Sequence, residues 1–466
     1  METTTPTSSY SGRNTVVLGL GRSGMAAARL LLRCGAVVTI CDSGDSAALL
    51  ERAAMLHGEG ALVLTGAAAE NDPTRYDLAI LSPGIEETTS LVTNVTRKGI
   101  PLIGELELAF TLCKCPVVAI TGTNGKTTTT ELTNRMLSGA GFRTAACGNI
   151  GTPMSELMGT GEAWDILVAE VSSFQLERIV TFRPKVALWL NLSPNHLDRY
   201  PSMQEYREAK LRIFENQTER DWSVVPSGEE LPALKSRRIT FSTTSMEADL
   251  VLKGTEIQHR GSVLLDMART KLSGPHNAAN LMGAFGCGIA LGVDLKEMAA
   301  AVGDYTTPPH RCETISEIGG IRWINDSKAT NLDALEQAIR SVKGPLILIA
   351  GGKDKGFEFS PIAPLVLDRV SSAILIGEMR HRIARDWEPL PVTVVDSLKD
   401  AVILAADMAV PGSTVLFSPG TSSFDMFRDY IERGESFRRL VNEISLKHSP
   451  VDTGDFHLTV SEPTRS

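Results

Sequence analysis

The sequence predicts an α/β fold, and two regularities of the chain carry this prediction. Short apolar runs rich in β-branched residues alternate with longer segments of helical character, which is typical of parallel strands covered by helices on both faces. Two of these runs lead into glycine-rich turns that are followed by helical segments. The strand-like runs lie at residues 16–18, 37–40, 78–81, 117–120, 166–169, 186–190, 346–349, 373–376 and 414–417.

The length of the chain and two breaks in it predict three domains. A chain of 466 residues allows about two to four domains at roughly 100–200 residues each. One doubly wound domain rarely carries two phosphate-binding turns, so the turns at 19–24 and 122–127 should head separate domains. The first break lies within 104–116, and the second at 306–309, where two prolines disfavour a helix. We therefore expect domains at 1–108, 109–308 and 309–466.

The overall composition argues against several classes of protein. The net charge is −9 and no dense basic block occurs, so we expect no nucleic-acid partner. The first eleven residues lack the apolar run of a secretion signal, and no stretch reaches about 18 apolar residues, so we expect no membrane partner. The seven cysteines form no C-x-x-C pair and are typical of reduced thiols, which predicts a cytoplasmic protein.

The first glycine-rich turn has the pattern G-x-G-x-x-G between a strand and a helix. Its glycines, in the segment 19–24, allow a tight turn and a close approach of the backbone to a phosphate group. Asp42 ends the next strand, where an acidic residue often binds a ribose or a base. The turn alone does not distinguish NAD from another diphosphate, or a ligand site from a turn without a ligand. The segment 82–84 follows another strand at its carboxyl end, where such sheets bind ligands.

The second glycine-rich turn, at 121–128, contains a lysine followed by hydroxyl residues at the start of a helix. Backbone N–H groups of such a turn can surround phosphates, Lys126 can neutralise them, and Thr127 can bind magnesium. The spacing is a compressed variant of the usual phosphate loop, because Ile120 stands where that loop has its first glycine. The alternative is a lysine that merely begins a helix.

Three further residues have the chemistry that a magnesium and phosphate site needs. Glu170 follows an apolar strand and favours metal binding, since magnesium prefers hard oxygen ligands. His196 follows another strand in the same way, and its spacing leaves a structural and a functional role equally open. The spacing alone would make Lys210 an exposed residue of a helix at 204–214.

Taken together, these motifs resemble the Mur ligase family. The resemblance rests on the segments 121–128, 148–151, 170–176, 195–200, 209–210, 274–277 with Asn280, and 310–311. Within the family, the match is to the members that add D-glutamate. That narrower match rests on the N-terminal glycine turn and on the segments 82–84, 326–331, 351–356 and 418–427.

The resemblance implies a fold and a reaction. It implies a Rossmann-like N-terminal domain for a UDP substrate, a central P-loop-type ATPase domain with a mostly parallel sheet, and a Rossmann-like C-terminal α/β domain for the amino acid. It implies ligation of D-glutamate to UDP-N-acetylmuramoyl-L-alanine with ATP and Mg²⁺, through an acyl phosphate. Phosphorylation fits the chemistry, because a carboxylate is a poor electrophile without a leaving group. The expected partners are small molecules, and the expected state is a monomer.

The resemblance also implies the roles of individual residues. Catalytic roles fall to Lys126, His196 and Lys210. Two magnesium ions would be bound by Thr127, Glu170, His196 and a carbamate formed on Lys210. ATP would be bound by Gly122, Thr123, Asn124, Gly125, Lys126, Thr127, Thr128, Asn280, Arg311, Asp326 and Lys328. The UDP substrate would be bound by Gly21, Arg22, Ser23, Gly24, Asp42, Ser82, Pro83, Gly84 and Asn149. D-Glutamate would be bound by Thr330, Lys355, Ser423, Phe424 and Tyr430.

The sequence departs from the family pattern at three places. The family has a basic residue two positions after the aspartate that binds uracil, and here that position is Gly44. The segment 418–423 differs in its middle, so only Ser423 is carried over from it. Tyr430 stands where the family usually has phenylalanine.

Three alternative functions compete with this interpretation. An NAD-dependent dehydrogenase would explain the first glycine-rich turn but not the second, nor Glu170 and His196. A nucleotide-binding regulatory protein without turnover is disfavoured by the combination of Lys126, Glu170 and Lys210. A sister ligase for another amino acid, or an enzyme of folate polyglutamylation, is disfavoured by the N-terminal turn and the C-terminal motifs.

Overall fold

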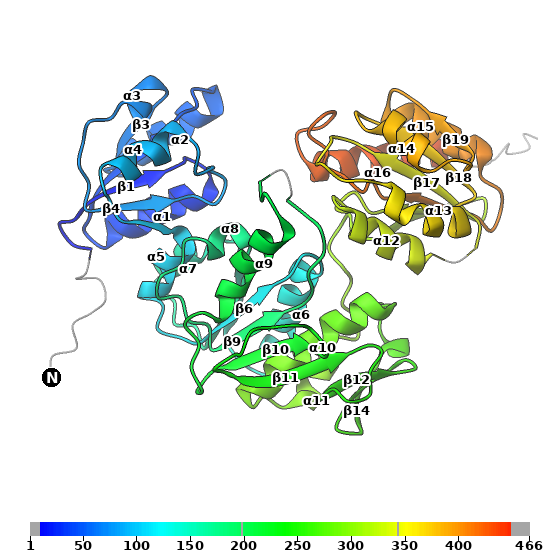
Figure 1. The fold of residues 1–466 in the computed structure, drawn as a ribbon, viewed down its shortest axis with the longest axis horizontal. Coiled ribbons are helices and arrows are strands. Elements are labelled where there is room, and N and C mark those ends of the chain that lie inside the picture. Colours follow the sequence, from blue (N-terminus) through cyan, green and yellow to red (C-terminus); the bar gives the residue numbers. More distant parts are fainter. Residues whose placement is uncertain (1–9, 197–198, 343, 449–466) are drawn as a thin grey trace, which may run out of the picture. The chain divides into compact units, whose positions relative to one another are not determined.

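The computed structural model describes residues 10–196, 199–342 and 344–448 of the chain. The chain divides into two compact units, Met1–Thr307 and Pro308–Ser466, and each is described by itself. The strands of the described residues form three sheets, each flanked by helices (Figure 1). The predicted α/β fold class is confirmed.

The first sheet has five parallel strands in the order β3-β2-β1-β4-β5. The central strand β1 is buried along most of its length, and the alanines and leucines of α1 pack against it. This is the predicted Rossmann-like arrangement, a fold in which the turns at the carboxyl ends of the strands commonly bind ligands. The strands are β1 (Asn14–Leu18), β2 (Val37–Asp42), β3 (Leu62–Thr65), β4 (Leu78–Leu81) and β5 (Leu102–Gly104), and the helices are α1 (Arg22–Arg33), α2 (Ala47–Gly58), α3 (Ala67–Glu70) and α4 (Ser90–Arg97).

The second sheet has nine strands in the order β14-β13-β12-β11-β10-β9-β6-β8-β7. The strands from β7 to β12 in this order run parallel, and β13 and β14 add antiparallel strands at one edge. Because β6 lies between β8 and β9, the ends of these three strands lie side by side at one edge. The strands are β6 (Val117–Thr121), β7 (Thr144–Gly148), β8 (Ile166–Glu170), β9 (Val186–Trp189), β10 (Trp222–Pro226), β11 (Arg237–Ser242), β12 (Leu250–Lys253), β13 (Glu256–His259) and β14 (Ser262–Asp266).

Helices cover both faces of this second sheet. Alternate residues of β6 point to opposite faces, so Val118 and Ile120 pack against α6 and α10, while Val117 and Ala119 pack against α5 and α7. The helices are α5 (Glu105–Leu112), α6 (Lys126–Gly139), α7 (Met154–Gly159), α8 (Ser173–Leu176), α9 (Met203–Leu211), α10 (Pro275–Leu291) and α11 (Leu295–Ala300).

Helix α5 joins the first sheet to the second through two buried glutamates. A side-chain oxygen of Glu105 accepts the N–H of Ser155 at 2.7 Å, and Glu107 accepts the N–H groups of Thr181 at 2.7 Å and Phe182 at 3.0 Å. Residue 108, where we predicted the end of the first domain, lies within this helix. The boundaries at 108 and 308 stay predictions.

The third sheet has six strands in the order β15-β16-β20-β17-β18-β19, and β15 is the antiparallel edge strand. Helices α12, α13 and α14 cover one face, and α15 and α16 cover the other. The strands are β15 (Glu313–Ile318), β16 (Ile321–Asn325), β17 (Leu346–Gly351), β18 (Ser372–Ile376), β19 (Val392–Val394) and β20 (Thr414–Phe417), and the helices are α12 (Leu332–Ser341), α13 (Ala363–Arg369), α14 (Arg380–Asp386), α15 (Leu398–Met408) and α16 (Tyr430–His448).

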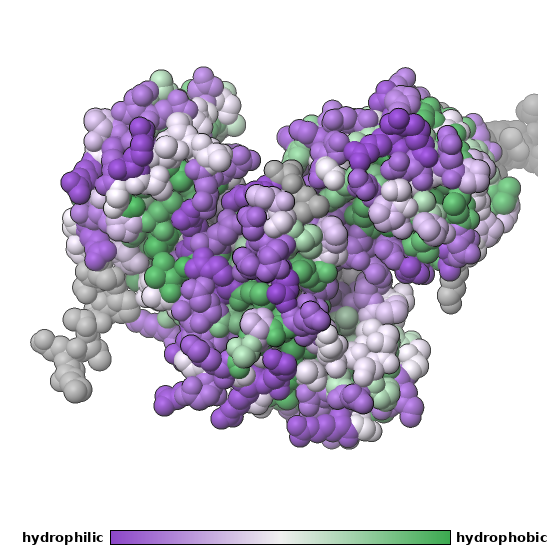
Figure 2. Space-filling view, in the orientation of Figure 1, coloured by the Kyte–Doolittle hydropathy of each residue, from purple (hydrophilic) through white to green (hydrophobic). Residues whose placement is uncertain are grey.

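On the face drawn in Figure 2, each unit carries many hydrophilic residues with apolar ones between them. None of the described helices combines the length and the apolar character that a helix needs to cross a lipid bilayer. The polar segments at 1–9 and 449–466 lie outside the described residues.

Candidate active site

The loop between β6 and α6 has the geometry of a phosphate-binding loop. Gly125 adopts a left-handed conformation with a φ of 79°, and a Cβ at this position would overlap the Asn280 side-chain oxygen. Gly122 has a φ of 153°, and a Cβ there would lie 3.0 Å from the Leu190 Cβ. Both positions therefore require glycine, and α6 begins with its N–H groups directed at the loop.

Asn191 holds this loop, and the sequence analysis missed it. Its side-chain oxygen accepts the N–H groups of Thr123 at 3.1 Å and Asn124 at 2.9 Å, and its Nδ2 donates to the Asn124 carbonyl at 3.1 Å. Asn191 follows the strand-like run at 186–190, so its place at a strand end was the signal that could have found it.

Two lysine ammonium groups contact carbonyls of the same loop. Lys126 Nζ donates to the Thr123 carbonyl at 2.8 Å, and Lys210 Nζ donates to the Gly122 carbonyl at 2.9 Å. Lys210 is only 2% exposed, so the expectation of an exposed lysine, drawn from its spacing alone, is wrong. Helix α9 turns this side chain inward, beside the Tyr206 ring.

Burial lowers the pKa of Lys210 well below its ordinary value. The positive charge of Lys126 lowers it further, and the carboxylate of Glu170 partly offsets both effects. A lysine in this position gives up its proton more readily than a surface lysine does. Such an amine can act as a nucleophile towards carbon dioxide, which is the first requirement of the carbamate that we predicted on Lys210.

Glu170 ends β8 beside the loop and is 2% exposed. One carboxylate oxygen, Oε1, accepts the Asn149 Nδ2 at 2.8 Å. The other, Oε2, is buried and has no hydrogen-bond partner among the described residues. A buried carboxylate oxygen without a donor fits a cation, and hard oxygen ligands suit Mg²⁺. Asn149, predicted to bind the UDP substrate, thus also orients Glu170.

His196 lies near the same loop in an aromatic cluster. Its backbone has a positive φ of 56°, its ring centroid lies 4.9 Å from that of Phe174, and the ring of Tyr206 lies at 6.0 Å. Leu197 and Asp198 of the same motif lie outside the described residues. Within the described part of the chain, no three His, Cys, Asp or Glu side chains cluster closely enough to hold a metal ion. A magnesium ion here would need Thr127, phosphate oxygens or a carbamate as further ligands.

Helix α10 brings Asn280 to the other side of the phosphate loop. The Asn280 side-chain oxygen accepts the Thr129 hydroxyl at 3.1 Å, and its Nδ2 donates to the Asn277 side chain at 3.4 Å. Thr128, the last residue of the predicted ATP-binding loop, is buried in the first turn of α6. The structure therefore brings together the ATP-binding residues that were predicted in the central domain.

The first glycine-rich turn is closed by its own backbone. A Cβ at Gly24 would overlap the Gly19 carbonyl oxygen and would lie 2.7 Å from Ser82 Oγ. Ser82 Oγ donates to the Gly19 carbonyl at 3.3 Å, which ties the end of β4 to the turn. Arg22 and Ser23 begin α1, and Nη2 of the exposed Arg22 lies 3.6 Å from Oε2 of Glu156.

The carboxylate of Asp42 supports this turn by accepting hydrogen bonds from backbone N–H groups. Its Oδ2 accepts the N–H of Leu20 at 2.7 Å, and its Oδ1 accepts the N–H of Gly44 at 2.9 Å. Arg52, from α2, donates to the Leu20 carbonyl at 3.4 Å. Arg52 was not identified from the sequence, because nothing in its spacing links α2 to the turn.

The C-terminal unit holds the remaining predicted residues. The carboxylate of Asp326 accepts the Ser418 hydroxyl at 2.8 Å and the N–H of Cys312 at 3.0 Å, and burial raises the pKa of Asp326 to about 6. Lys328 Nζ lies 3.6 Å from the centre of the Tyr430 ring, and Lys355 Nζ donates to the Thr330 carbonyl at 3.4 Å.

The loop after β20 carries the other two residues predicted for D-glutamate. Ser423 is buried, and its carbonyl accepts the N–H groups of Met426 and Phe427. Phe424 is 66% exposed, which leaves its side chain accessible. Arg311, predicted for ATP, is half-buried near the start of this unit.

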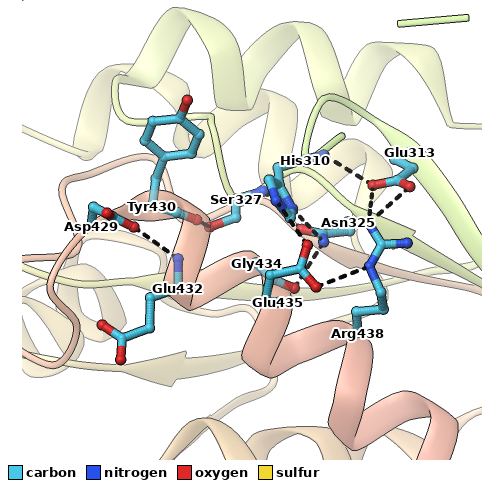
Figure 3. Close-up of polar contacts among 10 residues, drawn as sticks. All are labelled: His310, Glu313, Asn325, Ser327, Asp429, Tyr430, Glu432, Gly434, Glu435 and Arg438. Atoms are coloured by element: carbon cyan, nitrogen blue, oxygen red, sulfur yellow. Dashed lines mark hydrogen bonds and ion pairs between the residues drawn. The ribbon is translucent and has the colours of Figure 1, made fainter. Parts of the chain in front are cut away.

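His310 fastens the start of this unit to α16 (Figure 3). Asn325 Nδ2 lies 3.0 Å from the His310 Nδ1 and also donates to the Gly434 carbonyl at 3.0 Å, while the Asn325 side-chain oxygen accepts the N–H of Ser327 at 3.2 Å. These bonds fix the amide, so His310 Nδ1 is the acceptor and Nε2 carries the proton, 3.3 Å from Glu435. Burial lowers the pKa of His310.

Comparison with known proteins places these sites in a family. The Mur ligase MurD-like N-terminal domain matches residues 13–104, the Mur ligase middle domain 120–288, and the Mur ligase glutamate ligase domain 310–420. A protein of Geobacter metallireducens is 42% identical over 451 residues, which cover 94% of this chain and 99% of that protein. The chain belongs to the Mur ligase family.

Several relatives of this Mur ligase carry the same name. The Geobacter metallireducens protein and one from Geotalea uraniireducens, 42% identical over 92% of this chain and 97% of its own length, are both named UDP-N-acetylmuramoylalanine–D-glutamate ligase. Among solved structures, Thermotoga maritima MurF in complex with ADP has a TM-score of 0.62 and 16% identity over 89% of this chain and 96% of its own. The MurC ligase of the same organism has a TM-score of 0.60 and 18% identity over 93% of this chain and all of its own. These two structures support the three-domain fold.

Proposed function

We propose that this Mur ligase uses ATP to join the amine of D-glutamate to the carboxylate of UDP-N-acetylmuramoyl-L-alanine, the reaction EC 6.3.2.9 of peptidoglycan precursor synthesis. Two lysine side chains at the phosphate loop, Lys126 and Lys210, support the ATP-dependent step, together with a Glu170 oxygen that has no hydrogen-bond donor among the described residues. The names of relatives that match nearly the whole chain support the choice of amino acid.

The reaction takes place in two steps. A carboxylate oxygen of the alanine attacks the γ-phosphorus of ATP, so an O–P bond forms to give an acyl phosphate, and the bond to the β,γ-bridging oxygen breaks as ADP leaves. The neutral amine of D-glutamate then attacks the acyl carbon, so an amide bond forms and phosphate leaves with the electron pair of the C–O bond. The amine loses a proton in this step. ATP thus supplies the leaving group that the carboxylate lacks.

Residues of the central domain stabilise the charge that develops in the first step. Lys126 and the N-terminal N–H groups of α6 would bind the β- and γ-phosphates, and Asn191 holds the loop through hydrogen bonds to its backbone. Thr127, Glu170, His196 and a carbamate on Lys210 would hold Mg²⁺ at two positions. Bound there, Mg²⁺ would offset the negative charge of the transferring phosphoryl group.

The remaining roles also belong to the proposal. Asn280, Arg311, Asp326 and Lys328 complete ATP binding, and the first glycine-rich turn with Asp42, Asn149 and the segment 82–84 binds the UDP substrate. Thr330, Lys355, Ser423, Phe424 and Tyr430 bind D-glutamate. The enzyme would act as a monomer in the cytoplasm, with small molecules as its partners.

Phosphate release from ATP tests the proposal directly. The purified protein is given UDP-N-acetylmuramoyl-L-alanine, Mg²⁺, ATP and one amino acid from a panel of D-glutamate, L-glutamate, L-alanine, L-lysine and diaminopimelate. We expect release with D-glutamate and none with L-glutamate, because inversion at Cα misplaces either the amine or a carboxylate. Preference for another amino acid would refute the assignment of D-glutamate, and no release with any of them would refute ligation itself.

A further inference from the structure

The C-terminal unit contains an arginine in its interior. Arg433, on α16, is 1% exposed. Its Nε donates to the Ser327 hydroxyl at 3.0 Å, its Nη2 to the Ser327 carbonyl at 2.8 Å, and both Nη atoms to the Thr421 carbonyl at 3.2 Å. All of these hydrogen bonds of the guanidinium go to neutral oxygens.

A buried cation without a carboxylate partner is unfavourable for folding, because desolvation of the charge is only partly offset by neutral acceptors. Burial lowers the pKa of Arg433 to about 9, and the charges of Asp425 and Asp326 partly oppose this effect. The guanidinium therefore stays protonated at neutral pH and keeps all its donors. A side chain that is costly to bury and retains its charge calls for a role beyond filling space.

Arg433 joins three loops that leave the carboxyl ends of neighbouring strands. Ser327 belongs to the loop 326–331 after β16, and Thr421 belongs to the loop 418–424 after β20. The third loop, 351–356 after β17, approaches the guanidinium at Gly352, where a Cβ would lie 3.2 Å from Nη1 and would overlap the Ser422 carbonyl. The N–H of Lys353 donates to the same Ser422 carbonyl at 3.0 Å.

These loops carry the residues assigned to D-glutamate. Thr330 lies on the first, Ser423 and Phe424 on the second, and Lys355 on the third. Ser327 also donates its hydroxyl to the carbonyl of Tyr430 at 2.8 Å, which ties in the first residue of α16 (Figure 3). The guanidinium is thus hydrogen-bonded to two of these loops and packed against the third, and Ser327 links them to the start of α16.

Asp326 and Lys328, proposed for ATP, lie on the first of these loops beside Ser327, but each has a further anchor. Asp326 is held by Ser418 and by the N–H of Cys312, and the N–H of Lys328 donates to the His310 carbonyl at 3.0 Å. Loss of the guanidinium would therefore disturb the amino-acid pocket more than the ATP site.

We propose that Arg433 is a positioning residue that sets the relative places of these three loops, and thereby the affinity for D-glutamate. This inference rests on the proposed function. A planar fork with five donors can bond Ser327 and Thr421 simultaneously, whereas a lysine ammonium at the same place is a single point of charge. Shape therefore matters here as well as charge.

Steady-state kinetics of Arg433→Ala and Arg433→Lys test the inference. In the full-length enzyme, we expect the KM for D-glutamate to rise on the order of 10²-fold, because displacement by about 1 Å has effects of that size. The KM values for ATP and UDP-N-acetylmuramoyl-L-alanine should stay close to wild type. Millimolar guanidinium ion should lower the raised KM of the alanine variant. Arg438→Ala is the matched control, since Arg438 lies on the same helix and pairs with Glu313 instead.

Ser327→Ala provides a second variant in case the arginine variants do not fold. It removes one acceptor of the guanidinium and the bond to Tyr430, and it should raise the KM for D-glutamate in the same direction by a smaller factor. An unchanged KM for D-glutamate in folded variants overturns the inference. So does an equal rise for all three substrates together with a lower melting temperature. If the wild-type enzyme itself shows no D-glutamate-dependent phosphate release, the proposed function has failed instead.

Discussion

The two glycine-rich turns have the same local pattern, yet the molecule holds them by different means. In the first, at 19–24, the backbone packs on itself, because Gly24 lies directly on the Gly19 carbonyl, and the Asp42 carboxylate accepts the N–H of Leu20. The second, at 122–125, is held by the side chain of Asn191, which follows β9, and packs against the side chain of Asn280 from α10. The pattern of a strand, a glycine-rich turn and a helix therefore indicates a phosphate-binding turn, but it does not indicate which other residues hold that turn in place.

The cations beside the two turns differ as well. Arg52 donates to a carbonyl of the first turn, and two lysines, Lys126 and Lys210, donate to carbonyls of the second. An arginine keeps its charge and suits the binding of a phosphate that stays intact, whereas a lysine with a lowered pKa can also take part in chemistry. The comparison suggests that the first turn binds a diphosphate and the second serves phosphoryl transfer.

The largest effect that this comparison predicts is the loss of turnover in Lys126→Met. Removing a positioned positive charge from the transferring phosphoryl group should lower kcat about 10²- to 10³-fold. Binding of the UDP substrate at the first turn should remain, and calorimetry on the variant measures it. Near-normal kcat in a folded variant would contradict the assignment of the second turn to catalysis.

Lys210→Ala should also lose most of its turnover, for a different reason. If Lys210 acts as a carbamate, its alanine variant lacks an anionic oxygen ligand, and a small carboxylate such as acetate can occupy the space. We expect millimolar acetate or propionate to restore part of kcat in this variant and none in Lys126→Met. Full activity of the alanine variant without any added carboxylate would refute the role.

In the first turn, Asp42→Ala should act on binding. It leaves the N–H groups of Leu20 and Gly44 without their acceptor, and a hydrogen bond to a charged group is worth about 1.5–3 kcal/mol. The KM for the UDP substrate should therefore rise roughly 10- to 150-fold while kcat changes little. Asp45→Ala is the control, because Asp45 is exposed three residues further on. A fall in kcat at an unchanged KM would contradict the assignment of substrate binding to the first turn and catalysis to the second.

Much of this arrangement could be predicted from local sequence. Apolar runs located the strands, and polar residues directly after them, such as Glu170 and Asp42, were correctly expected at the carboxyl edges of the sheets. The structure explains most of the glycines that mark both turns: Gly19, Gly24, Gly122 and Gly125 occupy positions that exclude a Cβ or need an unusual φ, whereas Gly21 does not.

The supporting residues could not be predicted in this way, because they act across the fold. Asn191 and Arg52 reach the turns from segments about 70 and 30 residues away, respectively, and no spacing rule connects them. The prediction that Lys210 is exposed was wrong for the same reason, because helix periodicity does not reveal that its Nζ donates to the Gly122 carbonyl. Arginine is usually found at the protein surface, and Arg433 is buried here only because three loops pack around it.

The smallest predicted effect concerns stability and separates the two turns by what each can tolerate. Gly24→Ala places a methyl group against the Gly19 carbonyl, a backbone atom that cannot rotate away. We expect a loss of about 1–3 kcal/mol in the stability of the N-terminal domain, the usual range for overpacking, seen as a lower first transition in calorimetry. Gly21→Ala is the matched control: Gly21 has a φ of −77° and open space around its Cα, so its change should stay within about 0.5 kcal/mol.

At Gly125 of the second turn, the nearest obstacle is the Asn280 side chain, so Asn280→Ala should relieve part of the destabilisation caused by Gly125→Ala. The strain of a positive φ would remain. No side-chain substitution can relieve Gly24→Ala in this way, because its obstacle is the backbone. If Ser82→Ala fully restored the stability of Gly24→Ala, the obstacle at Gly24 would be a side chain, as it is at Gly125, and this contrast between the two turns would disappear.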